Sequence, residues 1–327
     1  MVQSVKRDKK DRVLSIRDLN ISFKTNYGVV NAIRGVRLDL FKGETIAIVG
    51  ESGSGKSVTC KTIMGILDSN GIIDSGEITL FYKDENGNEK TADLTKMSQK
   101  QIRYEFCGRK IAMVFQDPMA CLNPRKKVKE IIAQGLEIHH VCSSQKEVDE
   151  KVYAILEKVG LSKEQATRFP SQFSGGQRQR VGIARALVMN PKLVIADECI
   201  SALDVSIQAQ VVNLMKDLQE ELGTTYLFIA HDLSMVKYIS DRIGIMHLGH
   251  IVETGTTDEI FTNPIHPYTK SLLSAIPHPN PIVEKNRVAI TYDKEKEGVD
   301  YTKGVQHKLT DTHIVLATDE EFSRWTK

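Results

Sequence analysis

The chain has 327 residues, 26% of them charged, and a formal net charge of +2. This composition predicts an ordinary globular protein with one large domain and an appendage, or with two domains. The near balance of charge gives no general bias toward nucleic acid, and no run approaches the ~18 apolar residues that cross a bilayer. We therefore expect any role at a membrane to be peripheral.

The N-terminal residues and the cysteines both favour a chain that stays in a reducing compartment. Residues 1–12 carry five Lys or Arg and two Asp, with no apolar core behind them, so we predict a solvated basic tail and no signal peptide. No cysteine stands in a C-x-x-C pair, which favours free thiols over disulfides or a cysteine metal site. The five are Cys60, Cys107, Cys121, Cys142 and Cys199.

A glycine-rich turn between an apolar run and a helical pattern is the strongest motif. Its residues are Gly50, Glu51, Ser52, Gly53, Ser54, Gly55, Lys56 and Ser57. Such a turn lets backbone N–H groups converge on an anion at a helix N-terminus. Lys56 would reach the terminal phosphates, and the Ser57 hydroxyl would coordinate the accompanying Mg²⁺. A turn that binds nothing is the alternative, but the strand and helix predicted on either side favour a nucleotide triphosphate site.

Two strands of an antiparallel sheet are predicted ahead of this loop. Apolar residues alternate over 13–23 and recur over 29–40, with a turn at 25–28. Tyr27 lies on that turn, where an exposed aromatic ring can stack on adenine, although an isolated tyrosine more often only packs. Residues 76–81 predict a returning strand, and the turn signals within 83–90 predict a hairpin.

A helical insert is predicted to interrupt the sheet. The apolar run 111–115 ends at Gln116 because Pro118 stops the pairing, so Gln116 lies at a strand's carboxyl end, where ligands bind in open α/β sheets. Helical periodicity then runs from 128 to about 187. Inside it, a second glycine-bearing turn precedes a helix and forms another anion-binding N-terminus. This turn comprises Ser174, Gly175, Gly176 and Gln177.

Two further apolar runs are closed by chemically active side chains. Residues 193–196 end at Asp197 and Glu198, and residues 226–230 end at His231. Buried parallel strands would deliver all three to the same sheet edge. Asp197 suits the Mg²⁺ shell, and Glu198 is placed to polarise the attacking water. A solvated strand end and a structural histidine are the alternatives, which the phosphate loop disfavours.

Together these residues resemble the ATP-binding subunits of ABC transporters, over nearly everything from residue 13 to about 279. The phosphate loop alone indicates only an NTPase. The resemblance becomes specific because residues 173–177 look like the family's signature sequence and lie between Gln116 and Asp197, with Asp204 and His231 behind. It implies an α/β P-loop NTPase (RecA-like) core over 13–280, with an antiparallel β subdomain and an α-helical subdomain at about 117–187.

Within that family the chain is similar to the oligopeptide and dipeptide importer ATPases. Several segments resemble the patterns of that group: residues 116–118 with 122–124, then 202–210, and above all 264–273. Such importers normally pair two different ATPase subunits, and residues 202–210 and 264–273 favour the second of these subunits. The resemblance therefore implies ATP hydrolysis on the cytoplasmic face of the cell membrane, with two integral membrane permeases, an extracytoplasmic peptide-binding protein and no nucleic acid as partner.

The resemblance also implies a role for each site residue. Two ATPase subunits would close head to tail, so that residues 174–177 of one cap the γ-phosphate held by the loop of the other. Tyr27 would stack on adenine, Gln116 would sense Mg²⁺ and couple to the permeases, and Asp204 would lie near the nucleotide. Glu198 would be the general base, and His231 would contact the γ-phosphate. Ser57, Gln116 and Asp197 would hold the Mg²⁺.

Two departures from the family's pattern stand out. Cys199 replaces the usual proline after the catalytic glutamate, and no cysteine follows it, so we predict no iron–sulfur cluster. Residues 281–327 are polar with short apolar pieces at 288–290 and 313–317, which predicts a small strand-bearing appendage. His307 and His313 lack neighbouring ligands at a metal-binding spacing.

The motifs leave two other functions to consider: a soluble ABC-type ATPase and a cassette that only binds ATP. A soluble ABC-type ATPase acting on nucleic acid or ribosomes tends to have two cassettes or a long coiled-coil insert, whereas this chain has one phosphate loop and no extended heptad run. A silent cassette that only binds ATP is disfavoured by Lys56, Glu198 and His231.

Overall fold

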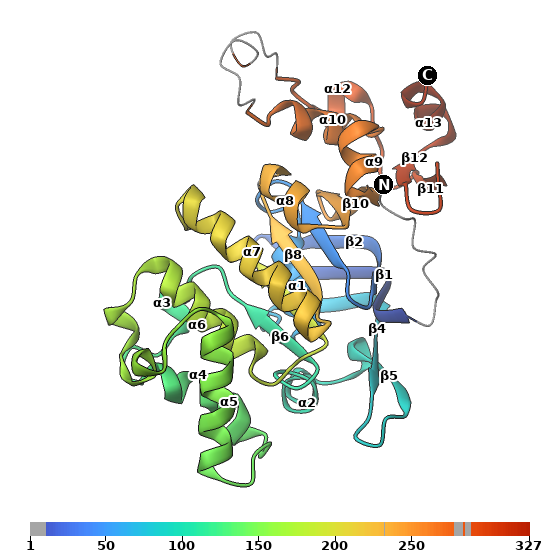
Figure 1. The fold of residues 1–327 in the computed structure, drawn as a ribbon. Coiled ribbons are helices and arrows are strands. Elements are labelled where there is room, and N and C mark those ends of the chain that lie inside the picture. Colours follow the sequence, from blue (N-terminus) through green and yellow to red (C-terminus); the bar gives the residue numbers. More distant parts are fainter. Residues whose placement is uncertain (1–10, 232, 278–283, 285–288) are drawn as a thin grey trace.

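The computed structural model describes residues 11–231, 233–277, 284 and 289–327. Most of the tail predicted over residues 1–12 therefore lies outside the described residues. Two β-sheets form the centre of the molecule, with a group of helices on one side and the C-terminal elements at the opposite end (Figure 1). This is the predicted α/β architecture.

The larger sheet has eight strands in the order β11-β12-β10-β9-β3-β8-β7-β6. The strands from β9 to β6 are parallel, and β10, β11 and β12 extend the sheet with antiparallel pairing. Their bounds are β3 (Thr45–Val49), β6 (Ile111–Val114), β7 (Leu193–Asp197), β8 (Thr225–Ala230), β9 (Arg242–His247), β10 (His250–Thr256), β11 (Val305–Lys308) and β12 (Ile314–Ala317).

The parallel strands are buried on both faces, which explains why they read as continuous apolar runs. In β3, Ile46 and Ile48 face a core shared with the second sheet, whereas Ala47 and Val49 face a core shared with the helices. All four side chains are fully buried. Successive side chains of a strand point to opposite faces, so five residues serve two cores.

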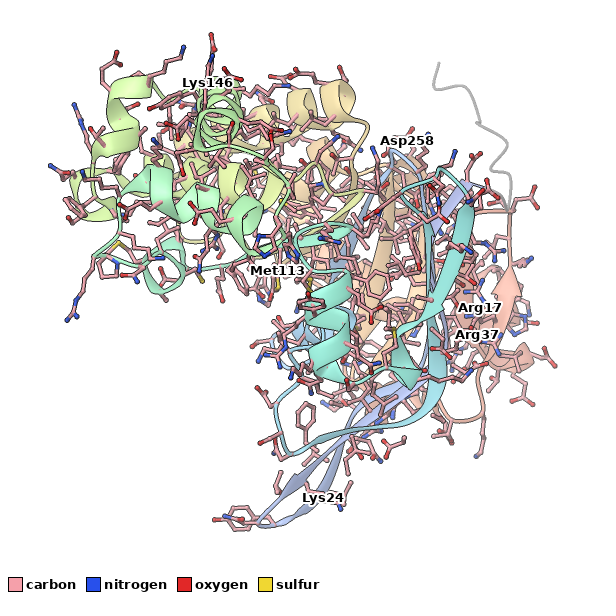
Figure 2. The ribbon with its side chains drawn as sticks, turned by 90° about the horizontal axis from the view of Figure 1, so that it is seen from below. Arg17, Lys24, Arg37, Met113, Lys146 and Asp258 are labelled. Atoms are coloured by element: carbon pink, nitrogen blue, oxygen red, sulfur yellow. The ribbon has the colours of Figure 1, made fainter. Side chains whose placement is uncertain are left out.

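The second sheet is antiparallel, with the order β2-β1-β4-β5. Its strands are β1 (Arg12–Thr25), β2 (Gly28–Phe41), β4 (Gly71–Lys83) and β5 (Glu89–Asp93). The predicted strands and the hairpin at 83–90 are thus present, and β4 is longer than predicted because it pairs along most of β1. Figure 2 shows the β1–β2 hairpin projecting from the body, with Lys24 near its tip.

The predicted helical insert packs against the parallel strands. In α4, Val128, Ile131, Ile132 and Leu136 are buried, the three- and four-residue spacing of one helix face. The helices and 3-10 turns from the phosphate loop to the end of the insert are α1 (Lys56–Ile63), η2 (Leu94–Lys96), α2 (Gln99–Glu105), α3 (Pro118–Cys121), α4 (Val128–Ile138), α5 (Gln145–Lys158), η3 (Lys163–Thr167), η4 (Pro170–Gln172) and α6 (Gly175–Leu187).

The C-terminal residues extend the main sheet. β12 pairs with β10, so the predicted strand at 313–317 extends the core, whereas residues 289 and 290 form no strand and residue 288 lies outside the described residues. The remaining helices are α7 (Val205–Leu222), α8 (Leu233–Ile239), α9 (Thr257–Thr262), α10 (Pro267–Ser274), α12 (Lys294–Glu297) and α13 (Asp319–Trp325). In the described part of the chain, none of the helices is long and apolar enough to span a membrane.

Candidate nucleotide-binding site

The candidate site lies where four parallel strands end. Val49 pairs with Ala230, and Asp197 pairs with Ile229, so the carboxyl ends of β3, β7 and β8 lie side by side. β6 ends beside them through its pairing with β7. The loops that follow these strands carry the predicted site residues, which therefore gather at one edge of the sheet.

The phosphate loop, residues 50–57, has two positions that only glycine fits. Gly55 has a φ of 109° and directly precedes α1. A Cβ on Gly50 would lie 2.0 Å from the carbonyl oxygen of Met246 on β9, closer than any real contact. These two glycines set the curl of the loop and its approach to the sheet.

Lys56 folds back into the loop. Its Nζ donates to the carbonyl oxygens of Gly50 at 2.7 Å and Glu51 at 2.8 Å, and the residue is only 3% exposed. Burial lowers the pKa of Lys56, while the nearby charges of Glu198 and Asp197 oppose that shift. The ammonium group therefore sits in the hollow of the loop, where phosphate oxygens would be stronger partners than carbonyl groups.

Ser57 and Asp197 form the candidate metal pair. The Ser57 hydroxyl donates to Asp197 Oδ1 at 3.1 Å. Burial raises the pKa of Asp197, and the neighbouring Glu198 charge adds to the rise. A half-buried carboxylate next to a second carboxylate and a hydroxyl is an oxygen-rich, anionic environment that favours a hard divalent cation. These residues fit the predicted Mg²⁺.

Glu198 is held between two neutral or cationic partners. Gln116 Nε2 donates to Glu198 Oε2 at 2.8 Å, and His231 Nε2 is in close contact with Oε1. His231 Nδ1 lies 3.2 Å from the carbonyl oxygen of Gly50, the first residue of the phosphate loop. A carbonyl oxygen and a carboxylate are both acceptors, so each ring nitrogen of His231 faces a hydrogen-bond acceptor. The predicted base, sensor and histidine thus meet at one point.

The backbone at Glu198 has an uncommon conformation. Its φ is 48°, in the left-handed region that non-glycine residues rarely adopt. Its N–H donates to the carbonyl oxygen of Ile229 at 3.1 Å, and its own carbonyl accepts from the Ser201 hydroxyl at 2.8 Å. A following proline disfavours helical-type conformations, so Cys199 is compatible with this geometry. Such strain is typical of functional sites.

The signature turn, residues 174–177, stands apart from this cluster. Ser174 caps α6 by accepting from the N–H of Gln177 at 3.3 Å, and Gln177 Oε1 accepts from the N–H of Ser174 at 3.0 Å. A Cβ on Gly176 would lie 2.6 Å from Ile207 on α7, so the turn packs closely on the start of that helix. In the described residues it makes no hydrogen bond to the phosphate loop.

Tyr27 and Asp204 are also separate from the cluster. Tyr27 lies on the turn between β1 and β2 with its side chain fully exposed, and its N–H donates to Thr25 Oγ1. Asp204 is exposed at the N-terminus of α7, next to the signature turn. Neither bonds to residues 50–57 within the described chain. Their predicted contacts with nucleotide therefore stay predictions.

One residue that contacts the phosphate loop was missed by sequence reasoning. The N–H of Glu51 donates to the hydroxyl of Tyr268, on α10, at 3.0 Å. Tyr268 lies within the motif at 264–273, which was the one sequence signal for its importance. Nothing in that motif indicates that the tyrosine contacts the phosphate loop. The two histidines weighed as metal ligands have structural partners: His313 Nε2 is 2.7 Å from Glu253 Oε1, and His307 stacks on Phe322.

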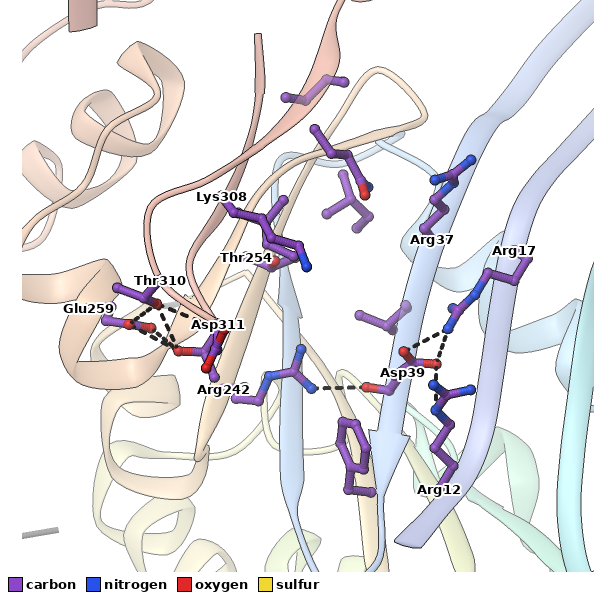
Figure 3. A pocket seen from close by; sticks show the side chains of 17 residues that line it. Arg12, Arg17, Arg37, Asp39, Arg242, Thr254, Glu259, Lys308, Thr310 and Asp311 are labelled. Carbon is purple, nitrogen blue, oxygen red and sulfur yellow. Dashed lines mark hydrogen bonds and ion pairs between the residues drawn. The ribbon is translucent and has the colours of Figure 1, made fainter. Parts of the chain in front are cut away.

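A second cleft, of about 1030 Å³, lies at the other end of the sheet between β2 and the C-terminal strands (Figure 3). Arg17 and Arg12 both face Asp39, and the Arg242 guanidinium donates to the Asp39 carbonyl oxygen. On the facing wall, Glu259 accepts from Thr310 and Thr312. These groups pair within the walls of the cleft, and we assign it no ligand.

Family models and curated relatives agree with this geometry. The model described as ABC transporter matches residues 33–201, and the one described as oligopeptide/dipeptide transporter, C-terminal region, matches residues 252–298. The chain is 49% identical to the oligopeptide transport ATP-binding protein OppF of Bacillus subtilis (strain 168), over 97% of this chain and 99% of that protein. The dipeptide transport ATP-binding protein DppF of Lactococcus lactis subsp. cremoris (strain MG1363) is 49% identical over 97% of each.

Solved structures show the same likeness. The chain resembles cbiO1 from Clostridium perfringens, part of the ABC transporter complex cbiONQ, with a TM-score of 0.64, 28% identity, and coverage of 77% of this chain and 92% of that one. It also resembles the dimeric post-hydrolysis state of the ATP-binding cassette MJ0796 bound to ADP and Pi, with a TM-score of 0.61, 28% identity, and coverage of 75% and 98%.

Fold and site together define an ATP-binding cassette of the P-loop NTPase class. Within that class, the chain belongs to the ABC transporter family. The predicted family and fold class are therefore confirmed, while the roles of individual residues stay predictions.

Proposed function

We propose that this chain is the ATP-binding and hydrolysing subunit of an ABC importer that takes up oligopeptides or dipeptides. One observation carries the proposal: Lys56, Ser57, Gln116, Asp197, Glu198 and His231 converge at one edge of the sheet. The peptide class is supported by the full-length similarity to oligopeptide and dipeptide transport ATP-binding proteins and by the match of residues 252–298 to the peptide transporter C-terminal region.

The phosphate loop would bind the triphosphate through its backbone and Lys56. On ATP binding, the Lys56 ammonium would exchange its two carbonyl partners for phosphate oxygens. Ser57 and Asp197 would hold the Mg²⁺, which would neutralise charge that develops on the phosphates. Because α1 starts at Gly55 without a side-chain cap, its first N–H groups remain oriented toward an anion.

Glu198 would act as the general base. Its carboxyl group accepts from Gln116 and lies in close contact with His231 Nε2, so its orientation is fixed before substrate arrives. A water molecule placed beside Oε2 would give its proton to this carboxylate as it attacks the γ-phosphate. His231, held against Gly50, would stay close enough to stabilise the charge on the phosphate.

The signature turn would complete the site of a second subunit. Its residues do not meet the phosphate loop of their own chain, and the resembling MJ0796 cassette is dimeric. In a head-to-tail dimer with a homologous ATPase subunit, residues 174–177 would face the γ-phosphate held by the partner. Tyr27 would stack on adenine and Asp204 would lie at the same interface. Hydrolysis would then depend on closure, which couples it to transport.

The remaining partners follow from the same proposal. The dimer would bind two integral membrane permeases on the cytoplasmic face of the membrane, and an extracytoplasmic protein would deliver the peptide. Gln116, which bonds to Glu198, lies between the sheet and the helical insert and would transmit permease movements to the base.

Uptake of a labelled peptide by cells tests the proposal directly. Cells that lack this chain should lose uptake, the wild-type chain should restore it, and Glu198→Gln should not. Glu220→Gln, the same chemical change at an exposed site on α7, is the matched control and should restore uptake. Unchanged uptake in cells that lack the chain would contradict the peptide importer, and capture of RNA or ribosomes instead of membrane subunits would favour the soluble ATPase.

A further inference from the structure

The helix α10 reaches the phosphate loop through one side chain. The hydroxyl of Tyr268 accepts from the N–H of Glu51 at 3.0 Å, although the two residues are 217 positions apart in the chain. Tyr268 is 1% exposed, and burial raises its pKa to about 12, so the hydroxyl is neutral at physiological pH. Glu51 is the second residue of the phosphate loop. The bond therefore fixes the loop where it leaves β3.

The start of α10 is itself fixed by a buried carboxylate. The N–H groups of Ile265 and His266 donate to the two oxygens of Glu253 at 2.8 and 3.0 Å. His266 then caps the helix, because its Nδ1 accepts from the N–H of Tyr268 at 3.0 Å. Pro267 follows at the first helical position, where proline is favoured. Ile265, His266 and Pro267 thus contribute to the placement of Tyr268.

The ring of Tyr268 is held from the C-terminal side. It stacks on His247 with ring centres 4.1 Å apart, and His247 Nδ1 lies 2.6 Å from the hydroxyl of Tyr301. The Tyr301 hydroxyl in turn lies 3.2 Å from that of Tyr292. Burial lowers the pKa of His247 to about 4, so a neutral imidazole supports the tyrosine ring. A continuous chain of contacts runs from Tyr292 to the phosphate loop.

We propose that Tyr268 is a positioning residue for ATP binding, through which C-terminal residues as far as Tyr301 hold the phosphate loop in its binding conformation. Loss of the hydroxyl would let the loop leave this conformation. The observed affinity for ATP falls with the fraction of molecules whose loop is competent. Glu198, Gln116 and His231 make no hydrogen bond to Tyr268 in the described part of the chain, so the chemical step would continue unchanged. The inference rests on the proposed ATP site.

The test compares two tyrosine-to-phenylalanine variants of the full chain in the assembled transporter. Tyr268→Phe should raise KM for ATP by about fivefold, the effect of one ordinary hydrogen bond, and leave kcat nearly unchanged. Tyr226→Phe is the control because Tyr226 is equally buried and its hydroxyl has no hydrogen-bond partner in the described structure. It should leave KM unchanged. Equal KM values for wild type and Tyr268→Phe, or an equal rise in both variants, would overturn the inference.

Hydrogen exchange provides a second, independent measurement. The Glu51 amide should exchange faster in Tyr268→Phe than in wild type, and Tyr301→Phe should raise the exchange rate and KM in the same direction by less. A purely structural role would lower the melting temperature and leave the Glu51 exchange rate and KM as in wild type, which would refute the proposal. If wild type binds no ATP, the proposed function fails as well, whereas normal ATP binding with an unaffected Tyr268→Phe refutes this inference alone.

Discussion

The phosphate loop and the signature turn are both glycine-bearing helix N-termini, yet they are built differently. At the phosphate loop, Gly55 leaves the start of α1 without a side-chain cap, and Lys56 occupies the hollow. At the signature turn, Ser174 and Gln177 cap α6 reciprocally. Within the described residues, the phosphate loop therefore leaves the first N–H groups of α1 without a side-chain partner, as a site for an anionic ligand. In the signature turn, the side chains of Ser174 and Gln177 already accept from each other's backbone N–H groups.

Their surroundings differ in the same way. The phosphate loop connects to Asp197, His231 and Tyr268 by hydrogen bonds that originate far along the chain. The signature turn bonds mainly within itself and packs on Ile207. One half of the site is therefore a network inside this subunit. In the proposed head-to-tail dimer the other half would be a surface that faces a neighbour, so a single chain would carry the parts of two incomplete sites.

The largest effect is expected from Glu198→Gln. The amide keeps the size of the side chain and an oxygen that can accept from Gln116, but it takes up no proton, so turnover should fall by about 10²–10³ or more while ATP binding persists. Steady-state hydrolysis by the assembled complex and ATP binding by the same sample measure the two quantities. Near-normal turnover would show that Glu198 is not the base.

Asp197→Asn should lower activity without lowering the stability of the free protein. Burial disfavours the ionised form of Asp197, as its raised pKa shows, so the neutral amide should leave the free protein equally or more stable. Loss of a carboxylate near the metal should weaken Mg²⁺-dependent hydrolysis by about 10–100-fold. The melting temperature of the free protein reports the first effect, and Mg²⁺-dependent steady-state hydrolysis by the assembled complex reports the second. Asp217→Asn, at an exposed position on α7, is the control and should change neither.

Two helix-cap variants sharpen the contrast between the halves of the site. Ser174 and Ser144 each accept from a backbone N–H three residues on, at 3.3 Å. Either change to alanine should lower the free energy of unfolding by about 1 kcal/mol. Only Ser174→Ala should also lower hydrolysis in the complex, by about tenfold, since its hydroxyl would face a charged phosphate. Equal activities would remove the signature turn from the site.

The last prediction concerns the pH dependence of stability. Burial lowers the pKa of His247 to about 4 and that of His266 to about 3, from an unfolded value near 6.5. Below that value the unfolded chain takes up protons that the folded chain does not. Stability should therefore fall as pH drops from about 6.5 toward 4, by up to ~1.4 kcal/mol per pH unit for each histidine.

The groups around these rings support that direction. Tyr268, Tyr292, Tyr301 and Trp325 contact one or both histidines, and the charges of Lys294 and Lys270 disfavour the protonated forms. Denaturant unfolding at several pH values measures the slope. His247→Gln should flatten it, whereas His140→Gln, at an exposed site, should not. A slope identical in all three proteins would exclude His247 as a source of it.

The site residues at the strand ends could be predicted because each follows an apolar run that only a buried parallel strand explains. Asp197, Glu198, His231 and Gln116 share this signal, and the structure brings them together. The glycine spacing of residues 50–57 likewise encodes a local conformation. Local patterns of this kind carry information within about ten residues of the motif.

Other features depend on contacts between distant segments. Tyr268 and Glu51 are 217 positions apart in the chain, and no local pattern records their contact. The same holds for β12: the sequence predicts a small strand-bearing appendage over residues 281–327, but not that its strand pairs with β10. The target of residues 174–177 is not in this chain at all under the proposed mechanism. Contacts between distant segments and between subunits could therefore not be predicted from local sequence patterns.

Hydrogen exchange at the signature turn tests the central claim most directly. In the assembled transporter carrying Glu198→Gln, addition of Mg²⁺-ATP should slow exchange at residues 50–57, where this chain binds nucleotide, and equally at residues 175–177, where it would cover the partner's nucleotide. Slowed exchange at both segments is the predicted result. Protection of the phosphate loop with unchanged exchange at the signature turn would contradict a site shared between two subunits.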